Sequence, residues 1–252
     1  MILHIPHASD VIPIGLRDQI VLSDEELTKE LLQMTDAFTD ELFDYPRATK
    51  VKFPISRLLV DVERFLDDTK EPMSQAGMGV IYTRTSHGRK LKRELREQEK
   101  IDLITQYYET HHSTLVESVK HELEKYGNAL IVDCHSFPSR PLPCDSDQSV
   151  PRPDFCIGTD LFHTPKSLIQ ITEQNLKGMG FRVGINRPYE GTMVPMEFYK
   201  KDHRVISIMI EVNRSLYMDE LAGKKTRAFE STKKQIITLL NSISDGDGVR
   251  LR

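Results

Sequence analysis

The chain of 252 residues has no tryptophan, few cysteines and no long apolar run. Its three cysteines (Cys134, Cys144 and Cys156) are odd in number and lack CxxC spacing, which argues against a disulfide framework or a thiolate zinc site and suits a reducing cytoplasm. No apolar run approaches the length that spans a membrane. The net charge of −4 gives no general attraction to nucleic acid or to anionic membranes.

Several common sequence signals are also missing. There is no GxSxG elbow, no P-loop and no GxGxxG segment after a strand. The N-terminus enters an apolar run without a basic segment or cleavage site, so no secretory signal is visible and we expect a cytoplasmic location. The length allows a full core, and we expect residues 1–252 to form a single domain with a flexible tail over 244–252.

Short apolar runs alternate with stretches of helical spacing. The apolar runs predict strands over residues 2–7, 50–54, 129–133, 154–158, 181–185 and 205–212. The helical spacing predicts helices over about 24–42, 89–126, 166–177 and 219–243. Residues 57–65 are expected to form a strand or its exit, and two loops, 66–88 and 137–153, could cover a site. The alternation predicts a three-layer α/β/α fold with a mixed, mostly parallel sheet.

Three predicted strands end in residues that can bind a metal or move a proton. The run Leu130–Val132 continues into Asp133-Cys134-His135-Ser136, the first strand ends at His7, and the last reaches Glu211. Open α/β sheets build their sites at the carboxyl ends of strands, and two histidines with a glutamate are the parts of a zinc hydrolase. A lone histidine is more often a surface or capped residue. The core-like strand before His135 and the loop after it favour the ligand role.

The third metal ligand is left open between two aspartates. Asp10 follows His7 by three residues, a spacing that a tight turn could bring onto one metal, although a capping role fits equally well. Asp36 and Asp40 are expected one turn apart on the first helix, where such a pair usually belongs to a solvated face. Asp36 would nevertheless lie at the edge of the buried stripe, where a carboxylate needs a cation.

Glu211 follows the apolar run Ile-Ser-Ile-Met-Ile, so its carboxylate has to be paired or functional. As a general base it would take a proton from the attacking water and later deliver it to the leaving nitrogen. The alternative is a structural salt bridge to Arg214. Cys134 is a poor nucleophile for His135, because adjacent strand residues point to opposite faces. By the same alternation His4 and His7 would diverge, and His7 is the better ligand candidate.

Four arginines lie next to predicted strand ends: Arg57, Arg64, Arg140 and Arg214. Arginine recognises carboxylates through a two-pronged, charge-assisted contact. Each arginine alone would more often be a surface charge. Several converging on one edge of the sheet would indicate an anionic substrate.

Short motifs in a fixed order along most of the chain resemble the N-formylglutamate amidohydrolase (N-formylglutamate deformylase) family. The motifs are Pro6-His7-Ala8-Ser9, Thr35-Asp36, Ser56-Arg57, Asp61-Val62-Glu63-Arg64, His111-His112, Asp133-Cys134-His135-Ser136, the segment 186–191 and the segment 211–220. Each motif is weak alone, and their order makes the resemblance specific. The family is similar in fold to zinc carboxypeptidases, so the resemblance implies that fold here.

The resemblance also implies roles for particular residues. It implies a zinc ion, or another divalent metal, held by His7, Asp36 and His135, and it favours Asp36 over Asp10. It makes Glu211 the catalytic base. Arg64 would stabilise the developing oxyanion or bind a carboxylate, and the further candidates for substrate contacts are Arg57, Asn186 and Arg214.

The implied reaction is hydrolysis of a C–N amide bond in a small acidic substrate. With N-formyl-L-glutamate the products would be formate and glutamate, as in histidine breakdown. A carboxypeptidase-like or other amide hydrolase on the same site is the first alternative. A catalytically silent ligand-binding relative is disfavoured by Glu211, and a structural protein would have no metal and no cleft at these residues. The chain departs from the family pattern at Glu63, where asparagine is usual, and at Thr192–Pro195, which shortens a glycine-rich stretch.

Overall fold

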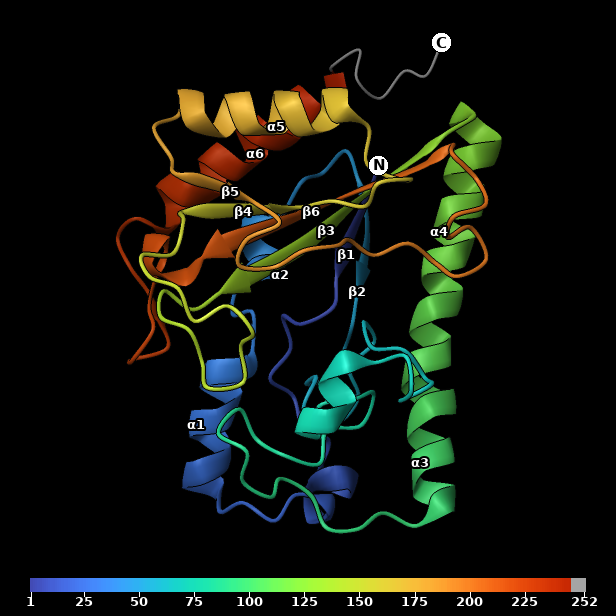
Figure 1. Cartoon of the computed structure of the whole chain (residues 1–252), viewed down its shortest axis with the longest axis vertical. Coiled ribbons are helices and arrows are strands. Elements are labelled where there is room, and N and C mark those ends of the chain that lie inside the picture. The colour runs from blue at the N-terminus through green and yellow to red at the C-terminus, as the bar shows by residue number, and fades with distance from the viewer. Residues whose placement is uncertain (246–252) are drawn as a thin grey trace.

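The computed structural model describes residues 1–245, which are built around a six-stranded sheet with helices on both faces (Figure 1). The strands are β1 (Ile2–Ile5), β2 (Thr49–Lys52), β3 (Ala129–Phe137), β4 (Phe155–Gly158), β5 (Val183–Ile185) and β6 (Val205–Asn213). They lie in the order β2-β1-β3-β6-β4-β5, and only the β4–β6 pair is antiparallel. The predicted three-layer fold with a mixed, mostly parallel sheet is confirmed. The predicted tail over 244–252 falls outside the described residues from 246 onward.

Helices cover the sheet from both sides. They are α1 (Asp24–Met34), α2 (Thr39–Leu42), α3 (Glu97–Leu103), α4 (Thr110–Tyr126), α5 (Lys166–Gly178) and α6 (Phe229–Asp245). Figure 1 shows α5 and α6 together over one face and α4 along the other, where α4 contacts β1, β2 and β3. The smaller elements are the 3₁₀ helices 14–19, 72–76 and 214–216, the π-helix 104–109 between α3 and α4, and the pair β7 (Met218–Asp219) and β8 (Lys224–Lys225). Within residues 1–245, no helix has both the length and the apolarity for crossing a bilayer.

Strand alternation decides which side chains enter the core and which line the site. On β3, Leu130, Val132 and Cys134 enter the core cluster that includes residues of α5 and α6. The alternate residues Ala129 and Ile131 face the opposite side of the sheet and pack against α4. Alternation therefore directs Asp133 and His135 to the α4 side. Cys134 is buried in the opposite layer, as its predicted exclusion from the chemistry requires.

The first helix ends earlier than predicted. Helix α1 stops at Met34 because Thr35 is extended, with φ −85° and ψ 135°, and α2 begins only after Phe38, whose φ is 65°. Asp36 therefore lies in the turn between the two helices, whereas Asp40 lies on α2 and pairs with Lys52. The prediction that Asp36 and Asp40 share one helix face is wrong. The turn frees Asp36 to reach the strand ends.

Three other predicted elements differ from the structure. Residues 57–65 form turns and no strand, and the helix predicted from 89 begins at Glu97. Part of the reason is Lys92, whose buried ammonium group bonds the carbonyls of Leu58, Leu59 and Tyr82 and fixes the irregular segment 57–65. The helix predicted from 219 begins at Phe229, because residues 218–225 form β7 and β8.

Candidate metal centre and active site

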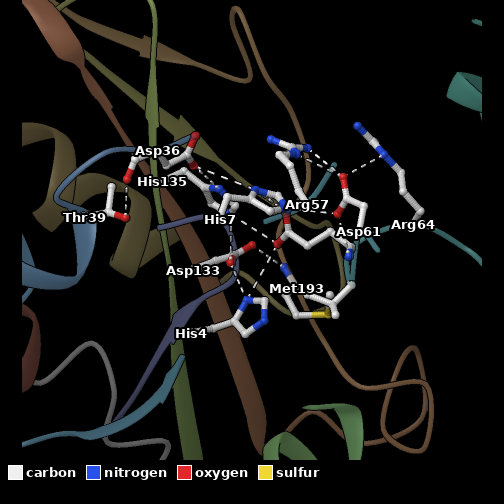
Figure 2. A network of polar contacts seen from close by, with 12 residues as sticks. His4, His7, Asp36, Thr39, Arg57, Asp61, Arg64, Asp133, His135 and Met193 are labelled. Atoms are coloured by element: carbon white, nitrogen blue, oxygen red, sulfur yellow. Dashed lines mark hydrogen bonds and ion pairs between the residues drawn. The ribbon is translucent and has the colours of Figure 1, made fainter. Parts of the chain in front are cut away.

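His7, Asp36 and His135 converge at the carboxyl end of the parallel strands (Figure 2). His7 follows β1, His135 lies on β3, and the backbone N–H of Asp36 donates to the carbonyl of His7 at 2.9 Å. All three residues are buried, and one ligand atom from each lies within 4.8 Å of the others. The Oδ2 atom of Asp36 is 3.8 Å from Nδ1 of His7 and 3.0 Å from Nδ1 of His135. Ligands on one tetrahedral zinc ion lie about 3.3 Å apart, so these distances suit a divalent cation.

The outer nitrogens of both histidines face carboxylates. His7 Nε2 is 2.9 Å from Asp61 Oδ1, and His135 Nε2 is 3.0 Å from Asp133 Oδ1. An ionised carboxylate only accepts hydrogen bonds, so both Nε2 atoms donate. Both Nδ1 atoms face Asp36, and without a metal His135 Nδ1 donates to its Oδ2 atom. Within residues 1–245, the buried Nδ1 of His7 has no hydrogen-bond partner. Metal-binding histidines are held by outer carboxylates in this way, and the unpaired nitrogen fits a metal ligand.

The electrostatics of the group also favour a positive charge. Burial alone would lower the pKa of His135, but the carboxylates of Glu63, Asp133 and Asp36 outweigh it and hold that pKa well above its usual value. Burial alone would raise the pKa of Asp36, yet His135, His7 and Arg214 lower it to about 2. A divalent ion would satisfy the same demand for positive charge at this position.

Arg214 holds Asp36 from behind. Its Nη2 atom donates to Asp36 Oδ1 at 3.0 Å and its Nη1 atom donates to the carbonyl of Gln33 at 2.6 Å, and the arginine is buried. The ion-pair partner of Arg214 within residues 1–245 is Asp36, so the alternative salt bridge to Glu211 is not formed. Arg214 lines the cavity, but its donors are directed to Asp36, Gln33 and Ser136, whereas the sequence predicted a substrate contact.

Glu211 lies beside His135 in the sheet. The two residues are partners in the parallel register of β3 and β6, so both side chains leave the same face. Glu211 is buried, and its Oε2 atom has no hydrogen-bond partner within the described part of the chain. Burial raises its pKa to about 8. A carboxyl group with a pKa close to neutrality can both accept and return a proton.

Arg57 and Arg64 share one carboxylate, that of Asp61. The Nη2 atom of Arg57 donates to Asp61 Oδ2 at 2.8 Å, and the hydroxyl of Tyr82 donates to the same oxygen at 2.6 Å. Arg64 is held more loosely, since its Nε is 3.4 Å from Asp61 Oδ2 and its Nη1 is 3.7 Å from Glu71. Its buried Nε has no hydrogen-bond partner within residues 1–245. Arg64 therefore keeps donor capacity for a substrate carboxylate.

These groups line one cavity of about 280 Å³. Its wall contains His7, Asp36, His135, Glu211 and, in addition, Arg57, Arg64 and Arg214. Residues of the proline-containing loop 138–153 close another side, as the sequence suggested for that loop. The predicted ligands, base and three of the four predicted substrate contacts therefore meet in one place.

Three other candidates lie elsewhere. Asn186 is exposed and bonded to the backbone and hydroxyl of Thr159, so the predicted substrate contact by Asn186 is not made from this position. The interpretation of an arginine cluster fails for Arg140, which is exposed and lies outside the wall of this cavity. Asp10 is also exposed, and Asp36 takes the place beside the two histidines.

The sequence reasoning missed the inward roles of Glu63 and His4. Glu63 Oε1 is 3.1 Å from His135 Nε2, and its Oε2 is 3.6 Å from His7 Nδ1. His4 Nδ1 donates to Asp133 at 2.7 Å, and His4 Nε2 is 2.9 Å from His111 Nε2. Strand β1 ends at Ile5, so the alternation of side chains along the strand does not extend to His7. Both His4 and His7 can therefore point into the network. The sequence did carry a signal for Glu63, because this glutamate stands where the family pattern usually has asparagine.

Comparison with known proteins places the chain in a class: it is a hydrolase that acts on an amide bond. It belongs to the N-formylglutamate amidohydrolase family, whose model matches residues 1–218. An N-formylglutamate deformylase from Pseudomonas putida is 26% identical over 231 residues, which cover 87% of this chain and 82% of that protein. The resemblance inferred from the motifs is thus confirmed.

Two solved structures share the fold. The crystal structure of an N-formylglutamate amidohydrolase from Ralstonia eutropha JMP134 matches 99% of this chain and 93% of its own, with a TM-score of 0.83 and 23% identity. A gene product from Agrobacterium tumefaciens matches 97% of this chain and 91% of its own, with a TM-score of 0.63 and 18% identity. At these identities the likeness concerns the architecture.

Proposed function

We propose that this protein hydrolyses the formyl amide bond of N-formyl-L-glutamate or of a related small N-acyl amino acid, with zinc held by His7, Asp36 and His135. The observation that carries the proposal is the unpaired, buried Nδ1 of His7, which faces Asp36 while Asp61 occupies Nε2. Family membership supports the amide substrate, and the Pseudomonas putida relative is named for deformylation of N-formylglutamate.

The donor set suits zinc because two imidazoles and one carboxylate leave a coordination position open for chemistry. When bound, the metal supplies a Lewis acid that polarises the amide carbonyl and makes the attacking water more acidic. Asp61 and Asp133 keep the Nε2 protons of the histidines in place, and Arg214 orients Asp36. Loss of such outer contacts typically costs roughly 10–100-fold in metal affinity.

Glu211 moves the proton. It takes a proton from water as the oxygen attacks the formyl carbon, and it returns that proton to the nitrogen as the C–N bond breaks. The products are formate and the free amino acid. Burial favours the protonated form of Glu211, and a nearby cation favours the carboxylate that the first step needs.

Arg64 anchors the substrate. Its donors are the least committed of the three arginines on the cavity wall, so it binds the α-carboxylate of the N-acyl amino acid. Arg57 is held by Asp61 and Tyr82 and adds a second positive charge in the same cavity.

The test is formate release from N-formyl-L-glutamate by zinc-loaded protein, compared with the Glu211→Gln variant. The proposal predicts turnover by the wild type, and a loss of at least about 100-fold in kcat for the variant with unchanged zinc content. No formate from any N-formyl amino acid would overturn the function. Loss of zinc by the variant would instead make Glu211 a ligand and overturn its role as base.

A further inference from the structure

A second cavity, of about 320 Å³, adjoins the site. Four residues line both cavities: Glu63, Arg64, Glu190 and Met209. Met209 precedes Glu211 by two positions on β6, so both side chains leave the same face of the sheet. The second cavity therefore begins beside the proposed base and the proposed carboxylate anchor.

The remaining wall of the second cavity is largely apolar. It includes Phe65, Tyr108, Met193, Val194, Met196 and Tyr199. Two of these large apolar side chains are open to solvent, since Phe65 is 43% and Met196 is 58% exposed. Figure 2 shows Met193 next to the polar network, where its N–H donates to Asp133 at 2.8 Å. Methionines adapt their shape to apolar ligands, so this wall suits an apolar group.

The charges of this cavity disfavour a carboxylate. Among residues 1–245, three carboxylates line it, those of Glu63, Asp133 and Glu190, and the first two already contact His135. Arg64 is the only guanidinium that these residues place on its wall. His112 adds no charge, because burial lowers its pKa, and its Nε2 lies 2.8 Å from the carbonyl of Val62. The side chain of glutamate would bring a second anion toward three carboxylates, with Arg64 already occupied by the α-carboxylate. An apolar side chain meets no such repulsion.

We propose that this second cavity binds an apolar side chain of the amino-acid part of the substrate. The inference rests on the proposed amide hydrolysis and ranks N-formyl amino acids with apolar side chains, such as those of leucine and methionine, above N-formyl-glutamate as substrates. The α-carbon of the substrate carries the formylated nitrogen, the carboxylate and the side chain, and each of them requires a binding position. With the nitrogen at Glu211 and the carboxylate at Arg64, the side chain is directed past Met209 into the adjoining cavity.

The experiment compares kcat/KM of the zinc-loaded wild type for the N-formyl derivatives of leucine, methionine, glutamate, lysine and glycine. We expect leucine and methionine to exceed glutamate and glycine by at least about tenfold, the gain typical of burying such a side chain. Glutamate or lysine as the best substrate would overturn the inference. Longer N-acyl derivatives of glutamate are assayed beside this series. A preference for them would also overturn the inference, because the apolar group would then lie on the acyl side. Inactivity on the whole series contradicts the proposed function instead.

A rim variant gives a second readout. Met196→Ser is expected to lower kcat/KM for N-formyl-leucine about fivefold and to leave N-formyl-glycine unchanged, since glycine places nothing in the cavity. Leu221→Ser is the matched control, because Leu221 is 95% exposed and lies outside this wall. An equal loss on both substrates, or no loss with leucine, would contradict the assigned subsite.

Discussion

The Nε2 atom of His7 lies 2.9 Å from Oδ1 of Asp61, and this contact turns the other ring nitrogen toward Asp36. A buried nitrogen without a partner destabilises the fold by the cost of its lost hydration. A metal ion at Nδ1 removes that cost. The contact between His7 and Asp61 therefore links the stability of the protein to metal binding.

Asp61→Asn should weaken zinc binding by roughly 10–100-fold, because the amide no longer fixes the His7 ring as the carboxylate does. Zinc affinity is measured by competition with a chromophoric chelator on protein whose folding is checked by circular dichroism. Asp67→Asn is the control, since Asp67 is 46% exposed and bonds only its own loop within the described residues. Unchanged affinity in folded Asp61→Asn would remove the proposed role of Asp61.

Zinc should raise the thermal stability of the wild type, because a ligand that binds only the folded state stabilises it by about 2.7 kcal/mol at 100 times Kd. The shift in the melting temperature should disappear in Asp36→Asn and persist in Asp40→Asn. Asp40 lies on α2, pairs with Lys52 and is not part of the metal site. Differential scanning calorimetry with and without zinc measures both shifts. A full shift in Asp36→Asn would exclude Asp36 as a ligand.

The metal-free protein should lose stability as pH rises from about 5 to 8. Burial raises the pKa of Glu211 to about 8, so the folded state holds a proton that the unfolded state releases near its ordinary pKa. The folded state binds more protons in this window, and its stability falls with pH by roughly 2–4 kcal/mol. Urea unfolding of the metal-free wild type and of Glu211→Gln is measured across this pH range. The difference between their free energies of unfolding isolates the contribution of Glu211. Parallel pH profiles for the two proteins would contradict the shift.

Lys92→Met should destabilise the protein by about 3 kcal/mol, because three buried carbonyls lose their shared donor. The carbonyls belong to the segment that carries Arg57 and Arg64, so KM should also rise. Denaturant unfolding measures the first effect and the formate assay the second. Lys90→Met, at an exposed neighbouring position, serves as control. A variant as stable as the wild type would show that Lys92 does not hold this segment.

The sequence predicted the parts of the molecule that follow from periodicity. The apolar runs before His135 and Glu211 predicted β3 and β6, and alternation correctly sent Cys134 to the other layer. The helical spacing from residue 24 onward predicted the start of α1, where Ser23 and Glu26 form a capping box in the structure. Local patterns of this kind specify element type and strand ends.

Contacts between distant segments could not be predicted. Helix α1 ends at the extended Thr35, α2 begins after the left-handed Phe38, and Asp36 between them bonds to His7; none of these features has a local signal. The helical spacing predicts that Lys92 lies on a helix, but in the structure its ammonium group is buried against three carbonyls from other segments. The sequence predicts a substrate contact for Arg214 because its charge is visible there, whereas its partner Asp36, 178 residues away, is not.

The zinc content of purified protein, measured by mass spectrometry after zinc loading and dialysis, tests the central claim most directly. The account predicts about one zinc ion per chain, retained in Glu211→Gln and lost when His7 is replaced by alanine. Zinc well below one ion per chain in the wild type, and not regained on addition, would contradict it.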